Sequence, residues 1–167
     1  DRMAAVLAAA RKAGLPVLFV RVVTAPETDS RALKDLYRRK GRPDSAFAIA
    51  RRGTPGVGYY RLFPDPGDME VEKVLFDAFD GTDFDERLKA RGIESLIFVG
   101  MTTDCCLDQA VRGAFQRNYD AMVVSDAAVA YTPALHFAGL MALESNCALL
   151  ARSDDVIAAL ARAPVPA

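Results

Sequence analysis

The chain has 167 residues, a length that suits one domain with a substantial core. Its 21 Lys and Arg and 22 Asp and Glu residues give a formal net charge of −1, which offers no basic field for nucleic acid, and no apolar run is long enough to cross a membrane. Three cysteines, two of them adjacent, do not make a disulfide framework, so we expect a reducing, cytoplasmic setting.

The apolar periodicity predicts a helix at residues 4–13, ended by Gly14, and a buried strand at residues 17–23. Residues 24–66 are irregular apart from a short polar helix at residues 30–39. Such a long excursion in a compact domain is typically a lid, a substrate loop or an oligomer contact, and a solvated, variable insertion is the alternative.

After the excursion, short apolar runs alternate with helical patterns. The sequence predicts strands at residues 71–76, 96–99, 121–124 and 147–150, and helices at residues 82–91, 105–118, 133–145 and 154–163. This alternation predicts a three-layer α/β/α domain over residues 1–167, with a mostly parallel sheet. Working residues of such sheets gather beyond the carboxyl ends of the strands, where we expect residues 101–106 and Asp126.

Residues 95–115 have the pattern of a strand, a tight turn and a helix. Thr103 and Asp104 are suitable N-caps, which places Cys105 and Cys106 in the first helical turn. There the free backbone N–H groups and the helix dipole favour a thiolate and can hold an oxyanion. Adjacent helical residues do not face the same way, so at most one cysteine is a nucleophile. The alternative is a pair of small, buried apolar side chains.

Two further residues carry possible chemistry. Lys73 interrupts a strand that otherwise looks buried, and a buried ammonium group is costly unless it is paired or used. The alternative is an edge-strand lysine that reaches solvent along its own stem. His136, the only histidine, lies in a helical pattern beside Phe137 and is more typical of a packed or capping residue than of a base. One histidine excludes a histidine-rich metal site, and no nucleotide-binding glycine motif is present, so we expect neither metal nor cofactor.

Several motifs occur together in a characteristic order. Lys73-Val-Leu-Phe-Asp-Ala-Phe79, then Gly81-Thr-Asp-Phe, then Gly100-Met-Thr-Thr-Asp-Cys-Cys-Leu resemble the isochorismatase-like cysteine hydrolases. That family has a Lys shortly before a Ser/Asp-Ala-Phe triplet and a Gly-x-x-Thr-x-x-Cys-Val motif. The resemblance continues through Asn118-Tyr119 and residues 123–127 to the helix that contains His136.

The resemblance implies that Cys106 is the nucleophile and Lys73 the catalytic lysine, with Cys105 where the family usually has a small aliphatic residue. It also implies a cis peptide bond between Met101 and Thr102, which aims the N–H groups of Thr102 and Cys106 at an oxyanion. The implied reaction is hydrolysis of a C–N bond in a small amide or ureide through an acyl-enzyme.

Three alternatives stay open. The first is isochorismatase-type cleavage of a vinyl ether, which relatives perform without the cysteine. The second is a non-catalytic member of the fold. Family members begin with a strand that ends in an Asp general base, whereas this sequence opens with the helix expected after that strand. We therefore expect about six strands, with the first missing from the sequence through trimming or true loss. The third, a thiol redox protein built on the adjacent cysteines, lacks a Cys-x-x-Cys motif.

The expected partner is a small amide or ureide. Phe79, Tyr59 and Arg61 are the candidate substrate contacts, since an aromatic wall and a carboxylate clamp formed with residues 51–52 and Tyr60 would suit an acidic substrate. A solvated loop or a subunit contact is the alternative for this segment. The resemblance also implies a homo-oligomer, and we expect no nucleic-acid or membrane partner.

Overall fold

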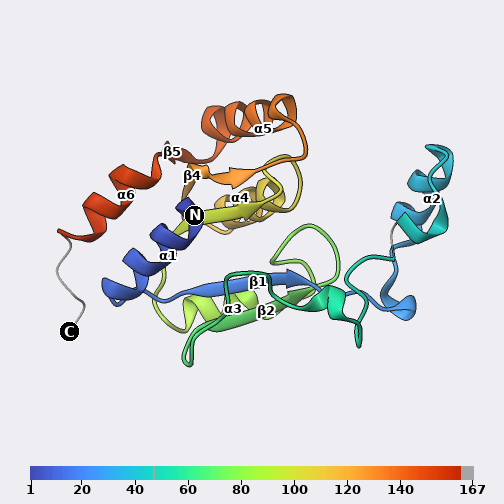
Figure 1. The fold of residues 1–167 in the computed structure, drawn as a ribbon, viewed down its shortest axis with the longest axis horizontal. Helices are drawn as coiled ribbons and strands as arrows, with labels where there is room; N and C mark the ends of the chain where they lie inside the picture. Colours follow the sequence, from blue (N-terminus) through green and yellow to red (C-terminus); the bar gives the residue numbers. More distant parts are fainter. Residues whose placement is uncertain (47, 163–167) are drawn as a thin grey trace.

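The computed structural model of the chain describes residues 1–46 and 48–162. Within these residues, five strands form two parallel sheets (Figure 1). In one sheet β1 pairs with β2, and in the other β4 lies between β3 and β5. The strands are β1 (Leu18–Val22), β2 (Met69–Lys73), β3 (Ser95–Met101), β4 (Asp120–Val129) and β5 (Leu149–Ala151).

Helices alternate with these strands, so the chain is an α/β protein as the periodicity predicts. The α-helices of the described residues are α1 (Arg2–Lys12), α2 (Arg31–Arg39), α3 (Phe84–Lys89), α4 (Cys106–Gln116), α5 (Pro133–Asn146) and α6 (Ser153–Leu160). Residue 163, at which the last predicted helix ends, lies outside the described residues. None of the helices described is both long and apolar enough to span a membrane.

Two neighbouring valines of β4 show how the layers form. Successive strand residues point to opposite faces of a sheet, and both Val123 and Val124 are fully buried. Val123 packs in a cluster with residues of α4 and α5, whereas Val124 packs with residues of α1 and α6. Helices therefore cover both faces of the β3–β5 sheet, as the three-layer prediction requires, and each buried valine contributes about 1.5–3 kcal/mol.

Strand β2 is displaced from its predicted position at residues 71–76. Its burial alternates, with Met69, Val71 and Lys73 inward and Glu70 and Glu72 outward. The strand ends at Lys73, whose ammonium group donates a hydrogen bond to the carbonyl of Phe76 in the turn that follows. This contact stabilises a turn at residues 74–76, which the sequence pattern predicts as the last three residues of the strand.

Asp126 was expected beyond the end of its strand but lies inside β4, which continues to Val129. Its carboxylate accepts hydrogen bonds from the backbone N–H (2.7 Å) and hydroxyl (2.9 Å) of Ser153 and forms an ion pair with Arg2 (3.0 Å). Burial opposes its charge, but these Ser153 hydrogen bonds and Arg2 together lower the pKa of Asp126. Asp126 therefore ties β4 to α6 and α1 and serves a structural role.

The excursion contains α2 and three short 3₁₀ helices, Pro26–Thr28, Asp44–Ala46 and Pro55–Val57. The polar helix predicted at residues 30–39 is confirmed as α2, which Ser30 caps by accepting a hydrogen bond from the Leu33 N–H at 3.2 Å. No residue of α2 is buried, and Figure 1 shows this helix away from the two sheets. Its position therefore depends on polar contacts more than on a hydrophobic core.

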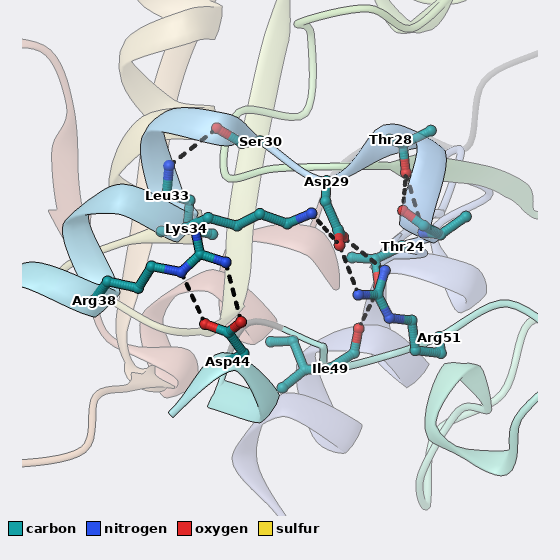
Figure 2. A network of polar contacts seen from close by, with 11 residues as sticks. Thr24, Thr28, Asp29, Ser30, Leu33, Lys34, Arg38, Asp44, Ile49 and Arg51 are labelled. Atoms are coloured by element: carbon teal, nitrogen blue, oxygen red, sulfur yellow. Dashed lines mark hydrogen bonds and ion pairs between the residues drawn. The ribbon is translucent and has the colours of Figure 1, made fainter. Parts of the chain in front are cut away.

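Figure 2 shows the polar contacts that hold the base of the excursion. The Asp29 carboxylate accepts two hydrogen bonds from Arg51, at 2.6 and 2.8 Å, and lies 3.0 Å from the Lys34 ammonium group. Nearby, the Thr24 N–H donates to the Ala50 carbonyl at 2.9 Å. The hydrogen bonds from Arg51, assisted by Lys34 and opposed by burial, lower the pKa of Asp29 to about 2. These contacts join the first residues of the excursion, which follow β1, to residues 50 and 51.

Candidate active site

The turn between β3 and α4 holds the two adjacent cysteines. Its peptide bond between Met101 and Thr102 is cis, at the position where the family resemblance places such a bond. The Thr102 carbonyl accepts hydrogen bonds from the N–H groups of Cys105 (3.0 Å) and Leu107 (3.1 Å). Cys106 is the first residue of α4, so its own N–H is among those without an intrahelical partner.

The helix cap differs from the prediction. Cys105 occupies the N-cap position and makes no side-chain capping hydrogen bond, whereas Thr103 and Asp104 precede it. Thr103 is fully buried, and its hydroxyl shares a 2.8 Å hydrogen bond with Nδ1 of His136 on α5. We expected Thr103 to cap α4, but its hydroxyl forms its hydrogen bond with His136 of α5 instead.

Helix α5 packs closely on this turn. Besides the contact between Thr103 and His136, a Cβ added at Gly139 would lie only 2.9 Å from the Thr103 carbonyl oxygen. The Thr103 N–H in turn donates to the carbonyl of Val129, at the end of β4, at 3.0 Å. His136 is therefore a packed residue that positions the turn, as its sequence context suggests.

Lys73 reaches this turn from the other sheet. It is only 5% exposed, so the alternative of an edge lysine in solvent is wrong. Its ammonium group donates a hydrogen bond to the Phe76 carbonyl, and its positive charge favours the thiolate form of Cys106. A buried ammonium group needs such partners. The structure thus brings together Lys73 and Cys106, the two residues that the motifs single out.

The two thiols differ in their affinity for a proton. The hydrogen bond from Cys105, together with the charge and hydrogen bond of Lys73, lowers the pKa of Cys106 to about 6, against burial and the negative charge of Asp104. The same Cys105–Cys106 hydrogen bond, burial and the charge of Cys106 raise the pKa of Cys105 above its ordinary value. Both cysteines are only half-buried, so a thiolate at Cys106 is accessible near neutral pH.

The three candidate substrate contacts have other partners. Phe79 is 4% exposed and lies in the core, with its ring against those of Phe84 and Tyr119. The Tyr59 hydroxyl donates to Glu70 at 2.7 Å, and the Arg61 guanidinium group lies over the ring of Tyr60, 5.3 Å from its centroid. Substrate contact by Phe79, Tyr59 or Arg61 stays a prediction.

The two arginines of the expected carboxylate clamp are paired with carboxylates of the chain itself. Arg51 binds Asp29, and Arg52 forms an ion pair with Glu72 at 3.0 Å. The pair of Arg52 and Glu72 joins the excursion to β2, whereas the pair of Arg51 and Asp29 lies within the excursion. Spacing alone does not reveal which carboxylate folds against which arginine.

Sequence reasoning missed the contributions of Cys105 and Asp104. Cys105 contributes to the lowered pKa of the thiol beside it, and the adjacency of the two cysteines was the available signal. Asp104 carries a buried Oδ1 atom with no hydrogen-bond partner in the described part of the chain, and its charge raises the pKa of both cysteines.

Over residues 1–46 and 48–162, no cluster of three or more His, Cys, Asp and Glu side chains is placed to bind a metal.

Known proteins are similar to this chain in sequence and in fold. The chain is 32% identical over 158 residues to the ureidoacrylate amidohydrolase RutB of Methylobacterium radiotolerans, covering 86% of this chain and 60% of that protein. It is 33% identical over 135 residues to RutB of Pseudomonas syringae pv. syringae, covering 72% and 53%. The chain therefore spans about half to three fifths of the length of these curated relatives.

Solved structures of related proteins are similar to this chain in fold. A cysteine hydrolase from Pseudomonas syringae pv. phaseolicola superposes with a TM-score of 0.84 at 25% identity, covering 96% of this chain and 78% of that one. An N-carbamoylsarcosine amidase from Thermoplasma acidophilum has a TM-score of 0.72 at 28% identity, covering 90% and 79%. A family model described as the isochorismatase domain matches residues 1–155. The chain therefore belongs to the isochorismatase family.

Proposed function

We propose that the chain hydrolyses a C–N bond of a small amide or ureide through a covalent acyl-enzyme at Cys106. The observation that carries this proposal is the position of the half-buried Cys106 at the start of α4, after the cis peptide bond between Met101 and Thr102, where the charge of the buried Lys73 helps to lower its pKa to about 6. A cysteine that is ionised near neutral pH is a competent nucleophile. Relatives named ureidoacrylate amidohydrolase and N-carbamoylsarcosine amidase support an amide or ureide as the substrate class.

The chemistry proceeds in two stages. The Cys106 thiolate attacks the carbonyl carbon and forms a tetrahedral intermediate, whose oxyanion the backbone N–H groups of Thr102 and Cys106 stabilise by about 3 kcal/mol for each donor. The C–N bond then breaks, a general acid protonates the leaving nitrogen, and an acyl thioester remains on Cys106. The general acid, now in its basic form, takes a proton from a water molecule that attacks the thioester; the acid product leaves and the thiolate is restored, stabilised by the charge of Lys73.

A vinyl-ether hydrolase, the alternative from the sequence, has less support. Cleavage of that bond needs no sulfur nucleophile in the relatives that perform it, whereas here Lys73 and Cys105 both stabilise a thiolate. The amide reaction makes use of this arrangement. The vinyl-ether reaction does not.

We also propose that residues 1–167 form one hydrolase domain in which residues 24–66 act as a lid or subunit contact of a homo-oligomer. Support comes from α2, which has no buried residue and is held by polar contacts at its base. Light scattering coupled to gel filtration measures the assembly. A monomer at all concentrations would contradict the oligomer.

The test of the activity is release of ammonia from a panel of small ureides and amides, including ureidoacrylate and N-carbamoylsarcosine. We expect Cys106→Ser to lose at least about a thousand-fold in kcat, because the hydroxyl of serine is not ionised by this site. Cys147→Ala is the matched control, since Cys147 is a buried cysteine in the cluster between α4, α5 and β4. A Cys106→Ser protein that hydrolyses its substrate at the wild-type rate contradicts the proposal.

A further inference from the structure

The segment that follows β2 is packed against α4 at a glycine. A Cβ added at Gly113 would lie only 2.6 Å from Oδ1 of Asp77 and 3.0 Å from a ring carbon of Phe79. Such distances leave room only for a hydrogen atom at this position. Ala110 and Ala114, one helical turn to either side on the same face of α4, are buried in the same cluster as Phe79 and are also small. Together, residues 110, 113 and 114 form a notch in α4.

The Asp77 side chain shapes the segment that enters this notch. Its Oδ1 accepts a hydrogen bond from the Phe79 N–H at 3.1 Å, which is the local bond of an Asx-turn. The carbonyl of the residue just before it, Phe76, accepts the hydrogen bond of the Lys73 ammonium group. Because Lys73 is buried and its ammonium group needs an acceptor, the position of this carbonyl determines where the group lies.

The notch also connects two parts of the described chain that no strand pairing joins. Strand β2, which ends at Lys73, lies in one sheet, and β3, which leads to Cys106, lies in the other. Gly113 belongs to the helix that begins at Cys106, so Asp77 links this helix to the turn that holds Lys73.

We propose that Asp77 is a positioning residue: seated in the notch of α4, it fixes the carbonyl that holds Lys73 and thereby sets how far the ammonium group lies from Cys106. This inference rests on the proposed function and deepens it, because it adds a residue that controls the surroundings of the nucleophile. Asp77 itself forms no bond to the substrate.

The size of the effect follows from the distance dependence of a charge interaction. An ammonium group about 4 Å from a half-exposed thiol lowers its pKa by about 1.5 units after solvent screening, and withdrawal to about 6 Å loses about a third of this. In Asp77→Ala we therefore expect the midpoint of Cys106 alkylation to rise by about half a pH unit, which lowers the rate at acidic pH about threefold. A loss of packing alone lowers the melting temperature and leaves this midpoint unchanged.

The experiment measures the rate of iodoacetamide alkylation of Cys106 against pH, with peptide mass mapping to separate the three cysteines. Asp77→Asn keeps an acceptor oxygen and should return the midpoint close to that of the wild type. Asp126→Ala is the matched control, because it removes a carboxylate that accepts from Ser153 far along the chain, and it should lower the melting temperature without moving the midpoint. In a Lys73→Met background, Asp77→Ala should cause no further rise.

Gly113→Ala tests the same contact from the side of α4 if Asp77→Ala does not fold. It should raise the midpoint in the same direction, and by less when Asp77→Ala is already present, because the two changes disturb one contact. An unchanged midpoint in folded Asp77→Ala or Gly113→Ala overturns the inference. So does an Asp77→Asn profile that matches Asp77→Ala, or a full shift in the Lys73→Met background. Alkylation needs no turnover, so these results are separate from the ammonia assay, which alone decides the proposed function.

Discussion

Replacing Lys73 by methionine removes the ammonium group but keeps an unbranched side chain of similar length in the same buried position. For two unit charges about 4 Å apart and an effective dielectric constant of about 20, an ammonium group stabilises a thiolate by about 4 kcal/mol. Cys106 is only half-buried, and screening by solvent reduces this to about 2 kcal/mol. The pKa of Cys106 should therefore rise by about 1.5 units from its value of about 6.

The consequence is measurable at pH 6.5. A rise of this size lowers the ionised fraction of Cys106 about eightfold, and the rate of ammonia release should fall at least as much. The assays are the pH profile of iodoacetamide alkylation and the kcat/KM for the ureide found in the substrate panel. Lys89→Met is the matched control, because Lys89 is an exposed lysine of α3 paired with Asp85 at 2.8 Å.

The reasoning is refuted if Lys73→Met keeps an alkylation midpoint near pH 6 while Lys89→Met does the same. In that case Lys73 would not be the source of the low pKa of Cys106. Thermal unfolding of both variants shows whether a change in activity comes from loss of the fold. We expect only a small change, since removal of a buried charge also removes its desolvation cost.

Three further predictions concern the turn and the excursion. Gly139→Ala should lower the free energy of unfolding by about 1–3 kcal/mol, because the Cβ of the alanine would lie 2.9 Å from the Thr103 carbonyl oxygen. Alanine normally stabilises an unhindered helical position, so a more stable variant would contradict this prediction. Asp29 has a folded pKa of about 2, below its ordinary 3.8, so it stabilises the fold above pH 4 and this contribution disappears as the pH falls toward 2. In Asp29→Asn, the melting temperature should therefore depend less on pH between pH 4 and pH 2. If the variant keeps the pH dependence of the wild type, the contact between Asp29 and Arg51 is not the cause of that dependence. Cys106, lowered from 9.0 to about 6, should likewise add stability above pH 9 that is lost as the pH falls to 6, and melting of Cys106→Ala should lack this dependence.

Local sequence determines the elements of this protein. Apolar residues at helical and strand spacing predict the alternation of β3, α4 and β4, and the break at Gly100 followed by polar residues predicts the turn that holds Cys106. The strand period also explains why Lys73 points inward, since it follows Met69 and Val71 at every second position. These patterns involve residues close in the chain, whose geometry the backbone itself imposes.

Tertiary structure alone determined the partners of the polar groups. The Thr103 hydroxyl binds His136 rather than capping α4, Arg51 binds Asp29, and Arg52 binds Glu72. A side chain with several possible partners takes the one that packing brings within hydrogen-bond distance. That distance depends on how sheets and helices far apart in sequence come together, so local spacing could identify the residues of the site but not their contacts.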